Sequence, residues 1–319
     1  MGVPQIDYAE VWRDMLEAWG LPPEIAGQQP EPEKPEDEGD GWQHLALHFQ
    51  RMAEQALEEP PGPLISRVLD RATAGTTVLD VGAGTGRQTL QLAPYVGRVI
   101  AVEPSPAMRE FLADELEKRG LKNVELVPDR WQDAQVPVAD IVVCANVLYD
   151  VQDLVPFLRK LDEQAREACF IEITFRHPLT PMNELWRRFQ GIERPERPDY
   201  FDAVAVFHQM GIHANVQIER VPASLWYSDL DEAVESFRRR LHLEPDPQRD
   251  AELRDYVHKN SRKAQGRIYP GPPARRIVIL WWEKEKESQA TYQDHCSNTT
   301  PRYHCQNRAT PSSTEILGS

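Results

Sequence analysis

From residue 77 onward, short apolar runs alternate with segments whose apolar residues recur every three to four positions. The runs predict seven strands, at Thr77–Val81, Arg98–Val102, Val124–Val127, Asp140–Ala145, Ala168–Thr174, Asn215–Val221 and Arg276–Trp282. The periodic segments predict helices at Pro106–Arg119, Leu154–Ala165, Asp229–Leu241 and Asp250–Lys259, with a short one around Leu185–Phe189. Near-continuous apolar strands separated by helices are typical of a sheet covered on both faces. We therefore expect an α/β fold with a doubly wound, mostly parallel, seven-stranded sheet.

The chain on either side of this alternation has a different character. Ile6–Trp19 has the spacing of an amphipathic helix, and the acidic, proline-rich stretch GQQPEPEKPEDEGDG after it predicts a flexible linker. A second helix is predicted where Trp42, Ala46 and Phe49 share one face, which favours core packing over a cofactor wall. The polar stretch 286–319 predicts a disordered tail. The expected division of the chain is 1–41, 42–285 and 286–319.

Residues 178–214 interrupt the strand and helix pattern. This segment is rich in proline, arginine and aromatic residues. Its aromatic residues include Trp186, Phe189, Tyr200, Phe201 and Phe207. They fit either a lid over a small organic acceptor or a second hydrophobic cluster.

The formal net charge of −15 limits the partners that the chain can have. A chain of this charge repels nucleic acids and anionic membranes, and we interpret the basic run Arg238–Arg240 as a solvated helix face. No apolar run approaches the roughly 18 residues that span a bilayer. The first residues show no basic segment followed by an apolar one, so we expect no signal peptide. Cys144 and Cys169 fall inside predicted strands without a CxxC pattern, which predicts a reducing cytoplasm.

Two histidine–cysteine pairs, His295-Cys296 and His304-Cys305, lie in the predicted tail. These are residue types that bind zinc, but a zinc site needs an ordered scaffold to hold its ligands. We therefore expect no metal site.

The stretch VLDVGAGTGRQTL, residues 78–90, carries the first chemical signal. It reads as a buried strand, then a turn with glycines at every second position, then a helix. Glycine lets the backbone approach a ligand and adopt positive φ. A dinucleotide site has the spacing G-x-G-x-x-G, whereas this turn reads G-x-G-x-G. Asp80 would stand uncomfortably close to a pyrophosphate, so the turn favours a cationic ligand.

VLDVGAGTG resembles the first motif of the class I S-adenosylmethionine-dependent methyltransferases. The resemblance implies that a glycine turn wraps the methionine part of S-adenosylmethionine and that an acidic residue lies near its charged end. The positions that match are Asp80, Gly82, Ala83, Gly84 and Gly86. A structural role for Asp80, as a cap of the turn, is the alternative.

The resemblance continues into VIAVEPSPAM, residues 99–108. The family places an acidic residue at the end of its second strand to bind both ribose hydroxyls, which implies this role for Glu103, with Pro104 beside the cofactor. The alternative for Glu103 is a solvated strand end. Ser105 and Pro106 are interpreted as a helix cap and first helical residue.

Two later motifs match the family less closely. In PDRWQDAQVP, which occupies the place of the adenine-binding loop, Trp131, Gln132 and Asp133 are candidates and Asp129 is their rival. In ADIVVCANVLYDV, Asn146 and Tyr149 follow the strand that ends beside the methyl group in the family. From the helix that follows the linker, His44, His48 and Arg51 could reach the cofactor carboxylate or lie at the surface.

Catalysis by this family is an in-line displacement at a sulfonium, so positioning and desolvation can lower much of the barrier. A general base is needed only if the acceptor must lose a proton. Candidates by location are Tyr149, His177 and His208, with His213 beside them, and ordinary structural roles remain open for each.

The acceptor class is narrowed by exclusion. Family members that methylate amino groups of DNA bases carry an (Asp/Asn/Ser)-Pro-Pro-(Tyr/Phe) motif, and this chain has Asn146-Val147-Leu148-Tyr149 there. Together with the acidic charge, this departure favours a small-molecule acceptor. A nicotinamide-dependent oxidoreductase and a non-catalytic module that binds the cofactor are the two rival hypotheses.

Overall fold

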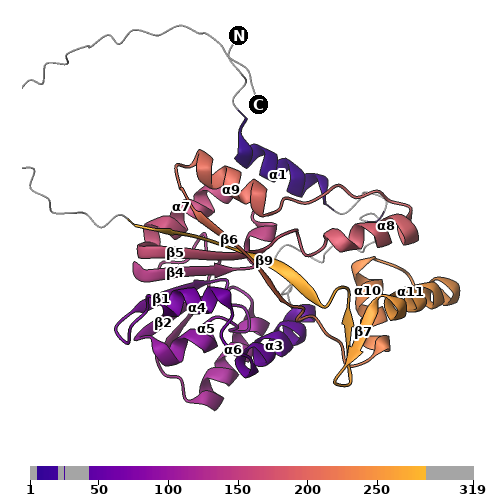
Figure 1. Ribbon diagram of the computed structural model, residues 1–319, viewed down its shortest axis with the longest axis horizontal. Coiled ribbons are helices and arrows are strands. Elements are labelled where there is room, and N and C mark those ends of the chain that lie inside the picture. The colour runs from indigo at the N-terminus through magenta and orange to yellow at the C-terminus, as the bar shows by residue number, and fades with distance from the viewer. Residues whose placement is uncertain (1–5, 21–24, 26–42, 285–319) are drawn as a thin grey trace, which may run out of the picture. The chain divides into compact units, whose positions relative to one another are not determined.

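The central sheet has seven strands in the order β3-β2-β1-β4-β5-β9-β6 in the computed structural model, which describes residues 6–20, 25 and 43–284 (Figure 1). The strands are β1 (Thr77–Val81), β2 (Arg98–Val102), β3 (Val124–Val127), β4 (Ala139–Ala145), β5 (Ala165–Thr174), β6 (Asn215–Pro222) and β9 (Ala274–Glu283). The strands from β3 to β5 in this order pair in parallel, and β9 is antiparallel to both β5 and β6. The predicted doubly wound, mostly parallel sheet is confirmed, as are all seven strands.

The helices lie in the predicted places, with two additional helices. They are α1 (Tyr8–Ala18), α3 (Gln43–Glu58), α4 (Pro63–Leu69), α5 (Thr89–Leu92), α6 (Pro106–Arg119), α7 (Leu154–Gln164), α8 (Asn183–Gln190), α9 (Tyr200–Gln209), α10 (Leu230–Arg240) and α11 (Pro247–Lys259). The sequence patterns missed α4, α9 and the hairpin of β7 (Ser261–Ala264) and β8 (Arg267–Pro270).

Helix α6 begins and ends where its sequence predicts. The Ser105 hydroxyl accepts a hydrogen bond from the Met108 amide at 3.2 Å, and Pro106 occupies the first turn. Gly120, at φ 66°, ends the helix in the left-handed conformation. This helix leads away from the end of β2, so its capped N-terminus fixes the chain beside Glu103.

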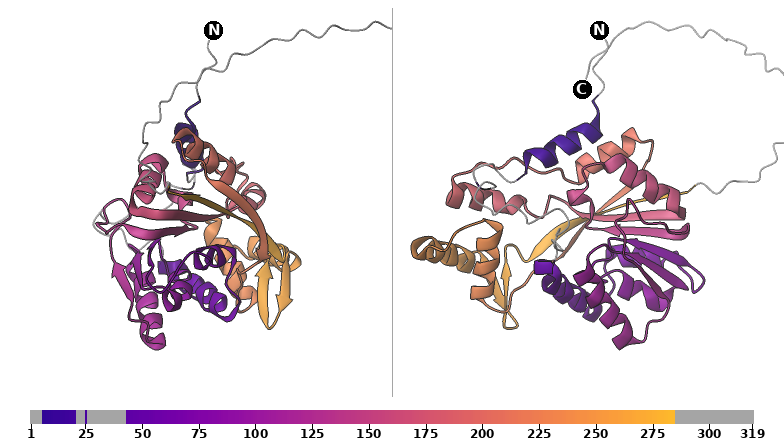
Figure 2. Two further views of the ribbon diagram at one scale, coloured as in Figure 1. Left: turned by 60° about the vertical axis from the view of Figure 1, so that its left-hand side comes forward. Right: turned by 180° about the vertical axis from the view of Figure 1, so that it is seen from behind.

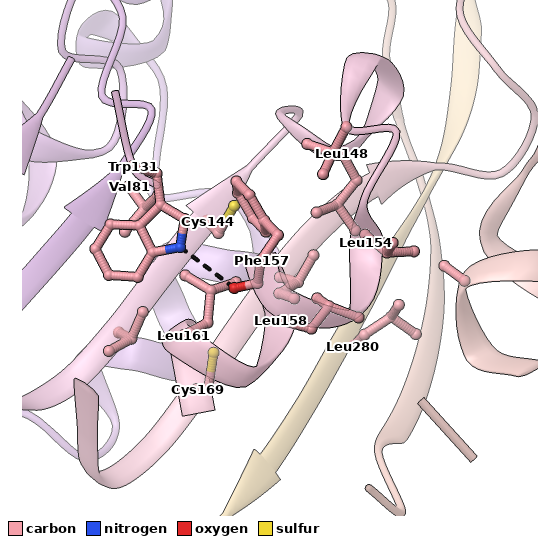
Figure 3. Packing of buried hydrophobic residues seen from close by; sticks show 14 of the residues in the cluster. Val81, Trp131, Cys144, Leu148, Leu154, Phe157, Leu158, Leu161, Cys169 and Leu280 are labelled. Atoms are coloured by element: carbon pink, nitrogen blue, oxygen red, sulfur yellow. Dashed lines mark hydrogen bonds between the residues drawn. The ribbon is translucent and has the colours of Figure 1, made fainter. Parts of the chain in front are cut away.

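Helices cover both faces of the sheet (Figure 2), and neighbouring residues of a central strand pack in clusters on opposite faces. In β1, Val78 packs in a cluster with α4 and α5, whereas Leu79 belongs to a cluster with α1, α7 and α9. Figure 3 shows part of the cluster that contains Leu79. In it, the Trp131 indole donates a hydrogen bond to the Phe157 carbonyl oxygen at 3.3 Å. Cys144 and Cys169 are buried in this sheet as free thiols. Because both faces are covered, the sheet exposes its carboxyl edge as the place for a ligand.

The N-terminal helix packs on the domain. Trp12 is 1% exposed, and its indole donates to the Val151 carbonyl oxygen at 2.8 Å. Helix α1 also lies beside α9 (Figures 1 and 2). The predicted linker and the predicted tail with its histidine–cysteine pairs lie outside the described residues, as does Trp42. The proposed division into three segments remains a prediction.

A separate hydrophobic group, here called the insertion cluster, joins two stretches of chain and Ile25. Its buried members are Ile25, Met182, Leu185, Trp186, Tyr227, Ala233, Leu241, Leu243, Leu253 and Val257. They come chiefly from α8, which follows β5, and from α10 and α11, which lie between β6 and β9. Of the aromatic residues in the predicted lid, Trp186 belongs to this cluster, whereas Phe207 packs in the main core and Phe201 is 68% exposed. Phe201 and Phe207 differ from Trp186 because they belong to α9, a helix that packs on the central sheet.

No helix of the described residues is long and apolar enough to cross a membrane. Nor do the histidine, cysteine and acidic side chains in that part of the chain form a group of three or more that could hold a metal ion.

Candidate active site

A large cavity of about 2200 Å³ opens at the carboxyl ends of β1, β2, β4 and β5. The loops after all four strands line it. β1 lies between β2 and β4, so the strand order reverses beside it, and this is where open α/β sheets bind ligands. Ligand sites usually measure about 300–1,000 Å³, so this cavity has room for a cofactor and a second molecule.

The glycine turn forms one wall of the cavity. Gly82, Ala83 and Gly84 line it, whereas Gly86 does not. The three glycines have φ of 73°, 57° and 92°, a region that favours glycine. A Cβ at Gly82 would collide with Val147, and one at Gly86 with Leu112, but one at Gly84 would meet nothing within 4 Å. Gly82 and Gly86 are thus required by packing, and Gly84 faces open space.

Glu103 lies at the end of β2 on the same wall and is 7% exposed. One carboxylate oxygen accepts from the Gly84 amide at 2.8 Å, and the other accepts from the Ser105 amide at 2.9 Å. A carboxylate can accept several hydrogen bonds, so these amides orient it without preventing it from accepting hydroxyl donors. Pro104 lies beside it on the cavity wall.

Asp80 lies beneath the turn and does not line the cavity. The residue is 1% exposed, and its carboxylate accepts a hydrogen bond from the Thr89 hydroxyl at 2.6 Å. Burial raises the pKa of Asp80 to about 6, with a contribution from Glu103, while hydrogen bonds from Thr89 lower it. The carboxyl thus acts on the cavity through its field and through the turn.

We expect Asp80→Asn to remove a pH dependence of stability. Because the pKa rises from 3.8 to about 6 on folding, protonated Asp80 favours the folded state. This contribution is fully present below pH 3.8 and is lost as the pH rises through 6. Its size is at most about 3 kcal/mol, at 1.36 kcal/mol per pKa unit. Asparagine can still accept from Thr89, so the variant should unfold at a higher urea concentration near neutral pH. Identical pH profiles of unfolding for both proteins would contradict this.

The adenine-loop candidates separate into two groups. Trp131 and Gln132 line the cavity, together with Arg130, but Asp129 and Asp133 do not. Trp131 is anchored by its hydrogen bond to Phe157 and is 4% exposed. Asp129 and Asp133 are exposed to solvent and do not contact the cavity. The arrangement favours Trp131 and Gln132 as the loop's ligand-facing residues.

Asn146 follows β4 and lines the cavity in a left-handed conformation, at φ 60°. Its amide donates to the Glu172 carbonyl oxygen at 2.7 Å, and its side chain donates to the Glu172 carboxylate at 3.1 Å. Arg87 pairs with the same carboxylate at 3.0 Å. Non-glycine residues with positive φ persist where their surroundings hold them, so Glu172 fixes Asn146 at the centre of the site.

Tyr149 lines the cavity close to Asn146. Its hydroxyl lies 3.2 Å from Asn146 Oδ1 and 2.8 Å from the Thr174 hydroxyl, and it accepts from the Thr174 amide at 2.7 Å. Burial raises its pKa to about 12. A phenol so held is a rigid, protonated wall near neutral pH rather than a base.

His177 also lines the cavity and is 3% exposed. Its Nδ1 lies 3.1 Å from the Leu179 amide nitrogen, and its Nε2 lies 2.8 Å from Arg197 Nη1. Burial, followed by the charge of Arg197, lowers its pKa to about 3. The ring is therefore neutral and is a weak base at physiological pH.

The remaining histidine candidates fall into two places. His208 and His213 lie 5.6 Å apart by ring centroids and line no part of the cavity. His48 lines it, and burial, then the charges of Arg240 and Arg51, lower its pKa to about 4. Arg51 also lines it and pairs with Glu232 at 2.6 Å. Helix α3 therefore contributes to the cavity as well as to packing, and the side chain of His44 lies outside the described part.

Sequence patterns missed three charged residues of the site. Glu172 interrupts the apolar run of β5 as Asp80 interrupts β1, and that signal could have found it. Arg87 directly follows the glycine turn. Arg275, at the start of β9, lines the cavity and carries no sequence signal, because nothing in its motif context distinguishes it.

Comparisons with known proteins find methyltransferases among the sequences similar to this chain. Residues 78–167 match a family model described as a methyltransferase domain. An uncharacterised protein of Haemophilus influenzae is 30% identical over 50% of this chain and 60% of its own length. A probable ribosomal RNA small subunit methyltransferase A of Methanosphaera stadtmanae is 35% identical over 25% of this chain and 30% of its length. (S)-coclaurine N-methyltransferase of Thalictrum flavum subsp. glaucum is 32% identical over 34% and 33%.

The chain therefore spans at most about three fifths of these relatives. Among solved structures, the YcgJ protein of Bacillus subtilis aligns with 70% of this chain and 98% of its own, at 17% identity and a TM-score of 0.47.

Proposed function

Since the chain belongs to the class I S-adenosylmethionine-dependent methyltransferase family, we propose that it transfers a methyl group from S-adenosylmethionine to a small-molecule acceptor. The observation that carries the proposal is the hydrogen bond between the Gly84 amide and the Glu103 carboxylate. It joins the ends of β1 and β2 into a single wall of the cavity, at the point where the strand order reverses.

The residues of this wall fit the cofactor. The space beside the Gly84 Cα, which a Cβ would occupy, is open toward the cavity and lets the backbone approach a ligand. Glu103 would accept the two ribose hydroxyls, and Trp131 with Gln132 would flank the adenine. Asp80 would favour a cationic group above the turn through its field, although it makes no direct contact with the cavity.

When bound, S-adenosylmethionine supplies a methyl group on a sulfonium sulfur. Asn146 and Tyr149 form the part of the wall after β4, and their hydrogen bonds to Glu172 and Thr174 hold them rigidly. A rigid wall that excludes water favours an in-line displacement by positioning and desolvation. Because Tyr149 and His177 are poor bases near neutral pH, the proposal assigns them positioning roles.

The class of acceptor is the open part of the proposal. By their names, the relatives include methyltransferases of ribosomal RNA and of the small molecule coclaurine. The net charge of −15 opposes a polyanion at the outer surface. The volume of the cavity beyond the cofactor wall also fits an enclosed small molecule.

The proposal is tested by ligand binding and then by transfer. S-Adenosylhomocysteine should raise the melting temperature of the full chain, and NADH should not. At a ligand concentration of 100 times Kd, the free energy of unfolding should rise by about 2.7 kcal/mol. Labelled methyl should then appear in the small-molecule fraction of a metabolite extract and not in added ribosomal RNA. Stabilisation by NADH would refute the cofactor, label in RNA would refute the acceptor class, and binding without any transfer would indicate a non-catalytic module.

A further inference from the structure

The cavity has the opposite charge to the chain. Its described lining includes eleven arginines and four glutamates, and no lysine or aspartate, in a protein of net charge −15. Arg239 and Arg240 of the run interpreted from sequence as a solvated face are among them. Positive charge gathered in a concave site attracts anionic ligands.

Several of these arginines are neutralised within the protein. Arg51 pairs with Glu232, Arg87 with Glu172, and Arg239 with Glu235. Arg275 differs, because within the described residues its guanidinium makes no hydrogen bond and no ion pair, and its Nε is buried. Burying a guanidinium N–H without a hydrogen-bond acceptor is costly, so we expect Arg275 to lower the stability of the ligand-free protein.

The surroundings of Arg275 place it on the acceptor side of the site. It interacts electrostatically with Arg87, Glu172 and Tyr149, the groups around Asn146. Burial, followed by repulsion from Arg87, lowers the pKa of Arg275 from its usual value. Glu172 is already shared between Arg87 and Asn146, so it does not cancel the charge of Arg275.

A second cation lies elsewhere on the wall. Arg194 is 8% exposed, and its guanidinium lies 4.0 Å from the ring centroid of Trp19 and 4.8 Å from that of Trp186. It donates to the Trp19 carbonyl oxygen, while Nε and Nη1 have no hydrogen-bond partner among the described residues. Two guanidinium groups without a hydrogen-bonded carboxylate, that of Arg194 buried and that of Arg275 partly buried, thus face one cavity.

We propose that the methyl acceptor is a small organic anion whose carboxylate or phosphate group binds the guanidinium of Arg275. This inference rests on the proposed function. Guanidinium binds both groups through paired N–H donors, and an anion at Arg275 lies next to Tyr149 and Asn146, where the methyl group is transferred. The outer surface is acidic and the cavity is basic. A small anion fits entirely inside the cavity, whereas a polyanion would also contact the acidic surface and be repelled by it, so the protein selects small anions.

The test measures anion binding by calorimetry to the full chain, with and without S-adenosylhomocysteine. The probes are benzoate, phenyl phosphate and their neutral counterpart benzamide, at up to millimolar concentration. At least one anion should bind and benzamide should not, and the preferred anion identifies the group. Arg275→Gln should weaken anion binding about 10- to 100-fold, and Arg275→Lys by less. Arg98→Gln, the control at the amino end of β2 and away from the cavity, should have no effect.

Further measurements distinguish anion binding by Arg275 from a structural role of this residue and from RNA binding. The melting temperature of ligand-free Arg275→Gln should equal or exceed that of wild type, and its affinity for S-adenosylhomocysteine should be unchanged; a large loss of either would show a structural role and overturn the proposal. Equal binding of benzamide, equal effects of Arg275→Gln and Arg98→Gln, or tighter Arg275-dependent binding of an RNA oligonucleotide would also overturn it. Arg275-dependent anion binding without S-adenosylhomocysteine binding would refute the proposed function alone.

Discussion

Gly84→Val is expected to abolish binding of S-adenosylhomocysteine while leaving a folded protein. The backbone at Gly84 has φ 57°, and the position of a Cβ there is open within the protein. A branched side chain at that position would project into the space where the cofactor is proposed to lie. The loss should exceed about 100-fold in affinity, since neither the turn nor Glu103 can retreat without breaking the hydrogen bond between them.

The control for this variant is Gly120→Val at the end of α6. Gly120 also has positive φ, at 66°, and its added Cβ would likewise meet nothing within 4 Å, but it lines no part of the cavity. Both variants should lose stability through backbone strain of about 1–3 kcal/mol. Thermal shift should then show stabilisation by S-adenosylhomocysteine in Gly120→Val and none in Gly84→Val. If both respond to the ligand, the turn does not contact it.

Glu103→Ala is expected to weaken binding of S-adenosylhomocysteine by about 2–4 kcal/mol, or about 30- to 1000-fold in Kd. Two charge-assisted hydrogen bonds to the ribose would be lost. The Gly84 and Ser105 amides would also lose the acceptor that orients them. Calorimetry on the folded variant measures the change.

Two companions to Glu103→Ala separate direct from indirect effects. Glu103→Gln keeps the size of the side chain and one acceptor oxygen, so it should lose less affinity, about 1–2 kcal/mol. Glu125→Ala removes an exposed carboxylate from β3, where it pairs with Arg98, and should leave affinity unchanged. An unaltered Kd for Glu103→Ala would remove Glu103 from the cofactor site.

The sheet could be predicted from sequence because its strands are buried on both faces. Such strands appear as continuous apolar runs, and β1, with Val78 and Leu79 in clusters on opposite faces, shows why. Helix α6 was predicted to the residue because Ser105, Pro106 and Gly120 mark both of its ends chemically. The proposed cofactor wall followed from the same source, since Gly84 and Glu103 sit at the ends of two such strands.

The acceptor side could not be predicted in the same way. The β7–β8 hairpin turns through Gln265 and Gly266, both at positive φ, without the Asn-Gly or Asp-Gly signal, and β7 is mostly polar. Arg275 stands far along the chain from the glycine turn, and only the pairing of β9 with β5 brings it beside Tyr149. Long-range pairing of this kind leaves no local pattern to read.

The insertion cluster has a consequence for recombination. It is assembled from one stretch after β5 and another between β6 and β9, and α9 and β6, which belong to the sheet layers, lie between them in the chain. A chimera that exchanged only one stretch with a relative would pair mismatched halves of a single apolar interface, around Trp186 and Leu253. A graft of this part of the molecule therefore has to carry both stretches while leaving the intervening framework in place.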